Sequence, residues 1–408
     1  MKTIKQVLGG DLRQYTMVLA LAVLIIVFNV ISGGRMLTPS NFQNLLSGNA
    51  YVLILALGML MVIVIGQIDL SVGSVAGFSG MVMALAARDY NLPWWLAVLL
   101  ALAIGAVVGA WNGFFVAKLG IPGFITTLGS WMMFRGLVIW ISQSISVPAP
   151  EELRFFGAGY LPEWGPTFTG MNNSTLVLGL IGIVCFAYFQ LKNHKRQGEI
   201  AGGVQDPMWA VVTRIVLVSA LIGYFTWLYG SGRAGTSFPI PGLILLILII
   251  IYHTLTQRTT FGRHVYAVGG NKNAAALSGV NVSRTYFLTF MNMSMLAAVA
   301  GILFVGRATA AGPADGTSWE MDAIASVFIG GAAVSGGVGT IIATMVGGLV
   351  MAVLNNGLML MGVGSDKTQV IKGLVLLAAV AFDVYNKSAG RPSIIGRLFG
   401  SGEEKKEG

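Results

Sequence analysis

The chain has 408 residues, of which 55% are hydrophobic and 10% charged, and its mean hydropathy is +0.77. A soluble domain carries about a quarter charged residues, so this composition excludes a soluble enzyme of this length. The net charge of +9 is explained by basic cytoplasmic loops of a membrane protein, without nucleic-acid binding. At about 20 residues per spanning helix, the fold class is an all-α polytopic membrane bundle with about ten spans.

Several kinds of site are missing from the sequence. A single cysteine, Cys185, rules out a disulfide framework and a cysteine metal site, and we predict no metal and no cofactor. No Gly-Lys pair occurs, so the chain has no phosphate loop of the Walker A type. We therefore predict no catalytic residues and a protein that does not itself hydrolyse ATP.

The predicted elements begin with a polar, basic stretch at 1–15 and an apolar run at 17–31 without a clear cleavage pattern. We interpret this run as a retained first helix. Two of the later apolar runs are too short to span comfortably, which predicts broken or re-entrant pieces. We expect one transmembrane domain over the whole chain, with the bundle at 16–386 and a tail at 387–408. The further apolar runs lie at 50–66, 71–87, 94–117, 122–142, 174–191, 208–229, 240–256, 285–306, 322–336, 339–361 and 368–385.

The polar connections divide by charge. Segments 191–207, 256–284 and 387–408 are rich in Lys and Arg, whereas 148–170 carries mainly acidic residues. Because basic loops stay in the cytoplasm, both termini are predicted to be cytoplasmic.

The two halves of the sequence share three landmarks in the same order. Phe134-Arg135-Gly136-Leu137-Val138 is paralleled by Ile371-Lys372-Gly373-Leu374-Val375, and Asn112-Gly113 by Asn356-Gly357. Ile65-Gly66…Ser71…Gly73 is paralleled by Ile329-Gly330…Ser335…Gly337. The spacing between landmarks differs by about one span, which predicts an inverted internal repeat with the pathway at the repeat interface. The alternative is a chance match between glycine-rich apolar segments.

Asp69 is the most informative single residue. It lies in Gly66-Gln67-Ile68-Asp69-Leu70-Ser71-Val72-Gly73-Ser74, between two apolar runs that leave no room for a solvated loop. A carboxylate at membrane depth costs about 2.5–3.5 kcal/mol on insertion scales, so it must face a partner, a cavity or water. Either Asp69 lines a pathway at a broken helix, or it caps a helix that begins at Leu70. The two roles are compatible.

Other polar residues fall inside predicted spans. Arg135 and Lys372 either extend to an interface along their apolar stems or face the pathway. Asn112, Asn355 and Asn356 either bond between helices or present amides to a polar solute. No charged pair can be placed firmly within the spans, which argues mildly against a zwitterionic substrate.

A short helix is predicted within the basic connection 256–284. Asn271 is a good N-cap, Ala274, Ala275, Ala276 and Leu277 favour helix, and Gly279 suits the C′ position. A helix of about two turns is marginal alone, so we expect it to dock on something.

These motifs resemble the bacterial monosaccharide ABC importer permeases of the ribose, xylose and galactose group. The resemblance rests on Gly66–Ser74 (GQIDLSVGS), 122–136 (PGFITTLGSWMMFRG) and 269–282 (GGNKNAAALSGVNV). The segment 366–386 and a basic insert near 192–207 are most similar to the xylose and multiple-monosaccharide permeases. The role of that insert is not assigned by the resemblance.

The resemblance implies a multi-pass permease in the bacterial inner membrane that passes a monosaccharide inward without covalent chemistry. It implies a homodimer of two permease copies in membrane lipid, a cytoplasmic ABC ATPase, and a periplasmic sugar-binding protein. The short helix would then correspond to the family's coupling helix, at Gly270, Asn271, Asn273, Ala274, Ala275, Leu277, Ser278 and Gly279. The residues that we predict along the substrate pathway are Asp69, Ser71, Trp111, Asn112, Phe124, Thr126, Arg135, Asn355 and Asn356.

Two alternatives remain at this point. One is an ion-coupled secondary transporter that uses Asp69, and the other is an importer permease of the same architecture for a nucleoside or an amino acid. Externally, we expect segments 148–170 and 312–322 to form part of the docking surface for the binding protein, because both carry carboxylates.

Overall fold

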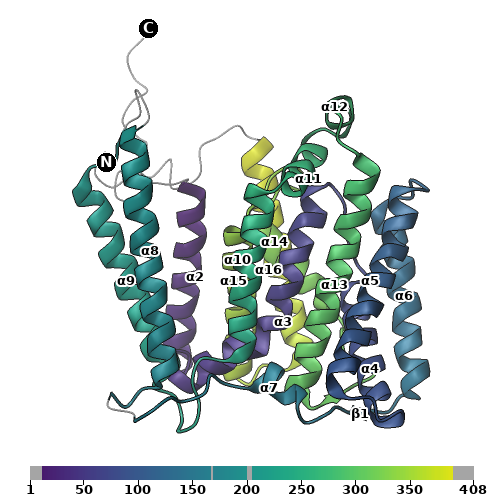
Figure 1. Cartoon of the computed structure of the whole chain (residues 1–408), viewed down its shortest axis with the longest axis horizontal. Helices are drawn as coiled ribbons and strands as arrows, with labels where there is room; N and C mark the ends of the chain where they lie inside the picture. Colours follow the sequence, from purple (N-terminus) through teal and green to yellow (C-terminus); the bar gives the residue numbers. More distant parts are fainter. Residues whose placement is uncertain (1–11, 167–168, 200–204, 389–408) are drawn as a thin grey trace.

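The computed structural model describes residues 12–166, 169–199 and 205–388. Helices dominate this part of the chain (Figure 1), and eight of them are long and apolar enough to cross a membrane. These eight are α3 (Pro39–Val64), α5 (Trp94–Ala117), α6 (Gly123–Ser142), α8 (Asn173–Glu199), α9 (Met208–Gly230), α10 (Ile240–Arg258), α13 (Val282–Ala308) and α15 (Ile341–Leu360).

Four further helices complete the bundle. α2 (Leu12–Ile31) and α16 (Ser365–Ser388) have 20 and 24 residues, which is enough to span. α4 (Val72–Asp89) and α14 (Trp319–Ile329) each follow an irregular segment, and the 11 residues of α14 are too few to span. The prediction of an all-α bundle with about ten spans and broken pieces is confirmed.

The bundle has two distinct ends (Figure 1). α11 (Thr260–Gly270) and α12 (Lys272–Leu277) lie at one end, here called the α12 face. α7 (Leu153–Ala158) and the antiparallel pair of β1 (Val147–Pro148) with β2 (Ala310–Ala311) lie at the other, here called the β1 face.

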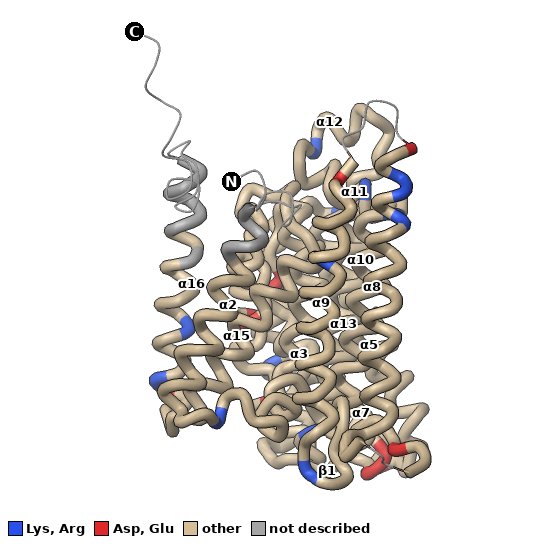
Figure 2. The backbone as a smooth tube through the Cα atoms, turned by 90° about the vertical axis from the view of Figure 1, so that its left-hand side faces the viewer, with Lys and Arg blue, Asp and Glu red and all other residues tan. Residues whose placement is uncertain are grey.

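The charged loops separate between these ends. The end of α8 and the α10–α13 connection both reach the α12 face, as the charge pattern predicts, while acidic residues gather beside α7 at the β1 face (Figure 2). Of the predicted N- and C-terminal tails, residues 1–11 and 389–408 lie outside the described residues.

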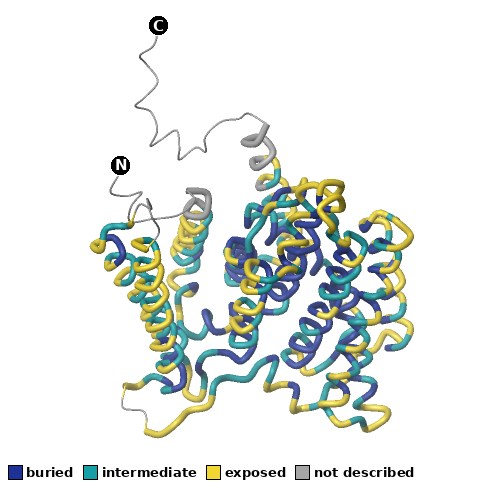
Figure 3. The backbone as a smooth tube through the Cα atoms, turned by 45° about the horizontal axis from the view of Figure 1, so that its top comes forward, coloured by how far each residue is buried: buried dark blue, intermediate teal, exposed yellow. Residues whose placement is uncertain are grey.

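The core lies around three of the spans (Figure 3). The most apolar windows of α3, α13 and α15 are 83%, 67% and 78% buried, against 11% for α8 and α9. α13 packs closely on α5 through Gly105, Gly109 and Gly113, which recur every four residues. An added Cβ at these positions would come within 2.5–2.9 Å of main-chain or side-chain atoms of α13, so the two backbones meet almost directly, as small residues allow in membranes.

Two of the three paired landmarks fall on helices that run in opposite directions. Asn112 and Asn356 lie near the ends of α5 and α15, and α5 ends at the α12 face whereas α15 ends at the β1 face (Figure 1). Arg135 on α6 and Lys372 on α16 are opposed in the same way. The third pair does not show this inversion, because Gly66 and Gly330 follow α3 and α14, and these two helices both end at the α12 face. Those two segments are spatial neighbours.

Candidate functional site

The break between α3 and α4 places Asp69 inside the bundle. Gly66 has a φ of +77°, which turns the chain back into the bundle after α3. Asp69 is fully buried, and its Oδ1 accepts hydrogen bonds from the backbone N (2.8 Å) and the Oγ (2.6 Å) of Ser71. Its Oδ2 has no partner among the described residues. Asp69 therefore stabilises the start of α4 and keeps one carboxylate oxygen free to accept a hydrogen bond. The helix begins at Val72, and the expected start at Leu70 is wrong.

A chain of buried hydrogen bonds extends from this carboxylate. Asn112 Nδ2 on α5 donates to Ser71 Oγ (3.0 Å), and Ser130 Oγ on α6 donates to Asn112 Oδ1 (2.6 Å). Asp69, Ser71, Asn112 and Ser130, here called the polar chain, thus connect the start of α4 with α5 and α6. The amide nitrogen and the amide oxygen of Asn112 both form hydrogen bonds within the protein. Of its two expected roles, Asn112 therefore has that of bonding between helices.

Two further polar residues of this region were missed by the sequence reasoning. Thr127 Oγ1 accepts from the backbone N of Leu70 (3.1 Å), and Gln67 Oε1 accepts from the N of Gly123 (2.8 Å). Both hold the α3–α4 break against α6. The sequence could have indicated them by position, because Gln67 lies two residues before Asp69 and Thr127 follows Thr126.

We expect Asn112→Leu to lower the stability of the folded protein by about 1–2 kcal/mol, the range for hydrogen bonds between membrane helices. The substitution removes both bonds of Asn112 and leaves Ser130 without its acceptor. Thermal unfolding in detergent measures the effect. Trp111→Leu is the control, because Trp111 is half exposed and contacts Phe115 instead. Equal melting temperatures for the two variants would contradict the polar chain.

A second polar cluster lies between α14 and α16. Lys372 Nζ is 2.7 Å from Oδ1 and 2.8 Å from Oδ2 of Asp322, and the two side chains are 17% and 7% exposed. Asn355 on α15 is half-buried beside this pair. Lys372 therefore does not extend to an interface along its stem, and the expectation that no charged pair lies within the spans is wrong. The cause is tertiary packing, which brings together residues 50 positions apart.

The segment before α14 and the first turn of α14 both enter the bundle. On α14, Glu320 and Asp322 are each 5% exposed. In the segment before it, the O of Asp315 accepts a hydrogen bond from Arg135 Nη1 (2.8 Å). An added Cβ at Gly73 would lie 2.1 Å from the O of Gly316, so this segment packs directly on the first turn of α4. The expectation that 312–322 is an external docking surface is therefore wrong for Glu320 and Asp322, whose carboxylates are buried, whereas Ala314 and Thr317 are exposed. Arg135 is held by this segment, and its place along a substrate pathway stays a prediction.

The remaining predicted pathway residues do not join the polar chain. Asn356 and Asn41 of α3 exchange two side-chain hydrogen bonds, at 2.9 and 3.1 Å. Phe124 and Trp111 lie on the surface, 52% and 48% exposed, and Thr126 Oγ1 has no partner among the described residues. The structure brings together Asp69, Ser71 and Asn112, and leaves the others in separate environments.

The short helix in the basic connection forms as the sequence predicts. Asn271 Oδ1 accepts from the N of Ala274 (2.9 Å), and Gly279 ends the turn with a φ of +85°. Lys272 Nζ lies 5.6 Å from the centre of the Tyr286 ring, which holds α12 against α13. Leu277 is 91% exposed, whereas Ala275 is 5% exposed and packs on the core. Ala275 therefore faces the bundle, and the expectation that it contacts a partner is wrong.

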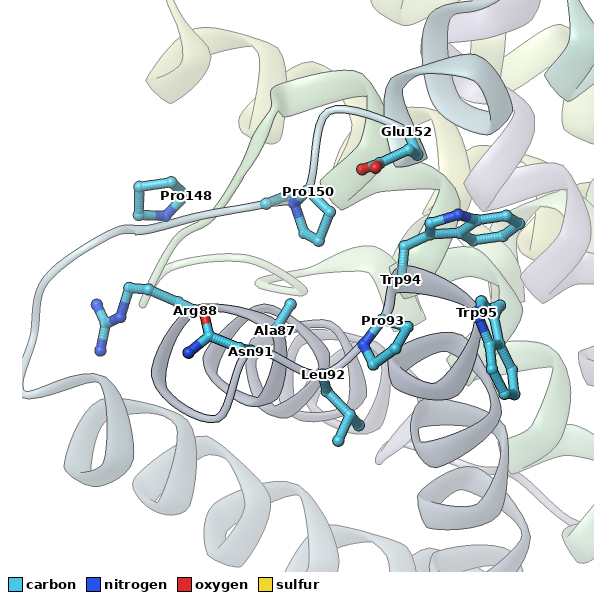
Figure 4. Close-up of a pocket in the computed structure, with 11 residues that line it drawn as sticks. Ala87, Arg88, Asn91, Leu92, Pro93, Trp94, Trp95, Pro148, Pro150 and Glu152 are labelled. Carbon is cyan, nitrogen blue, oxygen red and sulfur yellow. The ribbon is translucent and has the colours of Figure 1, made fainter.

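The described residues enclose two notable cavities, both outside the polar chain. One, of about 630 Å³, opens at the β1 face between Trp94, Trp95, Pro150 and Glu152 (Figure 4). The other, of about 220 Å³, lies between α8 and α9 and is lined mostly by polar side chains, including His194 and Arg214. Asp69 is fully buried and lines neither of these two cavities.

Known proteins align with this chain over nearly its whole length. The xylose transport system permease proteins XylH of Haemophilus influenzae and Escherichia coli K12 are each 35% identical over 379 residues, which is 92% of this chain and 97% and 93% of theirs. The ribose import permease protein RbsC of Escherichia coli K12 is 31% identical and covers 91% of this chain and 94% of its own. No solved structure gives a significant match. Residues 41–380 match the family described as branched-chain amino acid transport system, permease component, and the chain belongs to that family.

Proposed function

We propose that this chain is the membrane-spanning permease subunit of an ATP-driven importer for a monosaccharide, with xylose or a related sugar as substrate. The proposal is supported by relatives that are xylose and ribose permeases and align over more than nine-tenths of both chains. It is also supported by α12, a capped helix whose one large apolar side chain, Leu277, is almost fully exposed.

The exposed leucine is the observation that carries the coupling role. A leucine that is 91% exposed at a basic, water-facing end of a bundle gains free energy when a partner covers it. The chain has no phosphate loop of its own, so ATP hydrolysis belongs to a separate cytoplasmic ABC ATPase with a groove for α12. Gly270, Asn271, Asn273, Ala274, Ser278 and Gly279 complete the coupling element that we propose, and Ala275 anchors it to the bundle.

The orientation follows from the charges. The α12 face carries the basic connections, so it is cytoplasmic, together with both termini, in the inner membrane. The β1 face is then periplasmic and receives the sugar-binding protein. Glu151 and Glu152 are exposed there beside the 630 Å³ cavity (Figure 4). The exposed apolar surfaces of the outer helices face lipid and a second permease copy.

We expect Leu277→Glu to abolish co-purification of the ATPase and sugar uptake while leaving the permease folded. Loss of a central apolar contact costs about 2 kcal/mol or more at an interface, and a buried unpaired charge adds to this. Leu119→Glu is the matched control, because Leu119 is 56% exposed in the α5–α6 turn at the same face. Normal ATPase binding by Leu277→Glu would remove α12 as the coupling element.

Reconstitution in liposomes with the ATPase and the binding protein tests the substrate. Xylose, ribose and an amino acid are compared for stimulation of ATP hydrolysis and for uptake. We expect a pentose to stimulate both. Uptake by the permease alone, without nucleotide, would instead support an ion-coupled transporter.

A further inference from the structure

Three segments meet at the α12 face with their main-chain atoms in direct contact. They are the end of α3 at Val64, the end of α11 at Gly269 and Gly270, and the loop after α14 at Gly336 and Gly337. The N of Gly337 donates to the O of Val64 (2.8 Å). An added Cβ at Gly269 would lie 1.7 Å from that same O, and one at Gly337 would lie 2.9 Å from the Cα of Gly270. These five residues are here called the glycine junction.

The glycine junction connects α12 to the Asp69 break and to the α14–α15 loop. On one side, α11 runs directly into Asn271, the N-cap of α12. On the second side, Val64 is followed at once by the break that holds Asp69. On the third, Gly336 and Gly337 follow α14, which carries Glu320 and Asp322. A displacement of α12 therefore reaches the Asp69 break and the loop after α14 through this one junction.

Main-chain contact makes this connection stiff. Side chains absorb small movements by changing rotamer, whereas backbone atoms in van der Waals contact have no such freedom. α11 is also fixed to the bundle by Val265 and Val268, which are buried. We therefore expect α11 to move together with the end of α3 and the loop after α14.

A side-chain hydrogen bond joins the same two segments independently. Tyr266 Oη on α11 donates to the O of Gly339, in the loop that also holds Gly337 (2.6 Å). Burial raises the pKa of Tyr266 above its usual value near 10, so the phenol stays protonated and keeps donating across the physiological pH range. Two unrelated contacts thus connect α11 to the α14–α15 loop.

We infer that the glycine junction transmits movement of α12 to the Asp69 break and to the α14–α15 loop, with Gly269 as a positioning residue. The inference rests on the proposed function, in which an ATPase moves α12. It adds the route by which that movement reaches the interior.

The experiment compares Gly269→Ala with Gly223→Ala in the complex of permease, ATPase and binding protein reconstituted in liposomes. Gly223 lies in α9, outside the coupling element and the glycine junction, and an added Cβ there meets nothing within 4 Å, so this variant controls for a change from glycine to alanine within a helix. We expect Gly269→Ala to bind the ATPase and hydrolyse ATP normally but to lose uptake per ATP by about fivefold or more, the lower end of typical coupling between sites. Gly223→Ala should match the wild type.

Equal uptake per ATP in the two variants would overturn the inference, as would loss of ATPase binding by Gly269→Ala alone. Failure of the wild-type chain to bind any ATPase would overturn the proposed function instead. If Gly269→Ala does not fold, Tyr266→Phe decides the question, since it deletes one hydroxyl and keeps the ring. A loss of uptake per ATP with normal ATPase binding supports the junction, and unchanged uptake refutes it.

Discussion

Lys372→Ala should lower the free energy of unfolding by about 3–5 kcal/mol, because it leaves a buried carboxylate without its ion-pair partner. Asp322 is 5% exposed, and the Lys372 ammonium is within 2.8 Å of both its oxygens. The ion pair is also one of the few tertiary links that hold α16 on the bundle. Thermal unfolding in detergent measures the loss, with the melting temperature followed by intrinsic tryptophan fluorescence.

The matched control is Lys367→Ala, on the same helix and exposed. We expect it to change stability by less than about 1 kcal/mol, as surface substitutions do. The double variant Asp322→Asn with Lys372→Met removes both charges and should recover most of the stability. Equal melting temperatures for Lys372→Ala and Lys367→Ala would show that the pair does not stabilise the fold.

Asp69→Asn should preserve assembly and impair sugar uptake. The amide oxygen of asparagine still accepts from Ser71, so the start of α4 is retained. Replacing a charged acceptor with a neutral one loses about 1.5 kcal/mol, which corresponds to roughly tenfold in any rate that depends on the charge. Uptake into liposomes and co-purification of the ATPase are measured on the same preparation.

Asp69→Ala separates the structural role from the transport role. It removes both bonds to Ser71 and should destabilise the protein by about 1–3 kcal/mol, the cost of leaving buried donors unsatisfied. If Asp69→Asn transports normally, the charge has no part in transport and Asp69 serves only the helix start. If Asp69→Asn is as unstable as Asp69→Ala, the charge itself is structural.

Local signals in the sequence predicted the local structure well. The cap at Asn271 and the helix end at Gly279 each depend only on residues within one turn of that position, and both are confirmed. The break near Asp69 follows from a carboxylate and glycines between two apolar runs, and it too is confirmed.

The errors concern which side of an element faces the protein. The segment 312–322 has Gly, Pro and three carboxylates and therefore has the composition of an exposed loop, but two of these carboxylates, Glu320 and Asp322, are buried by α4 and α16. In α12, the run of three alanines has no apolar face, so nothing local indicates that Ala275 points inward. The pairing of Lys372 with Asp322 likewise depends on how α14 and α16 pack, which no window of sequence contains.

The glycine-lined contact between α5 and α13 has a consequence for how the protein is made. Gly105, Gly109 and Gly113 pack against residues near 287–298, so nearly 200 positions of chain separate the two surfaces. Contacts this distant in sequence form late, because the intervening chain must first be ordered. During synthesis, α5 enters the membrane with its glycine face uncovered until α13 has left the ribosome. A nascent chain truncated before α13 should therefore be a preferred target for membrane quality-control proteases, whereas a chain truncated after α13 should already resist them.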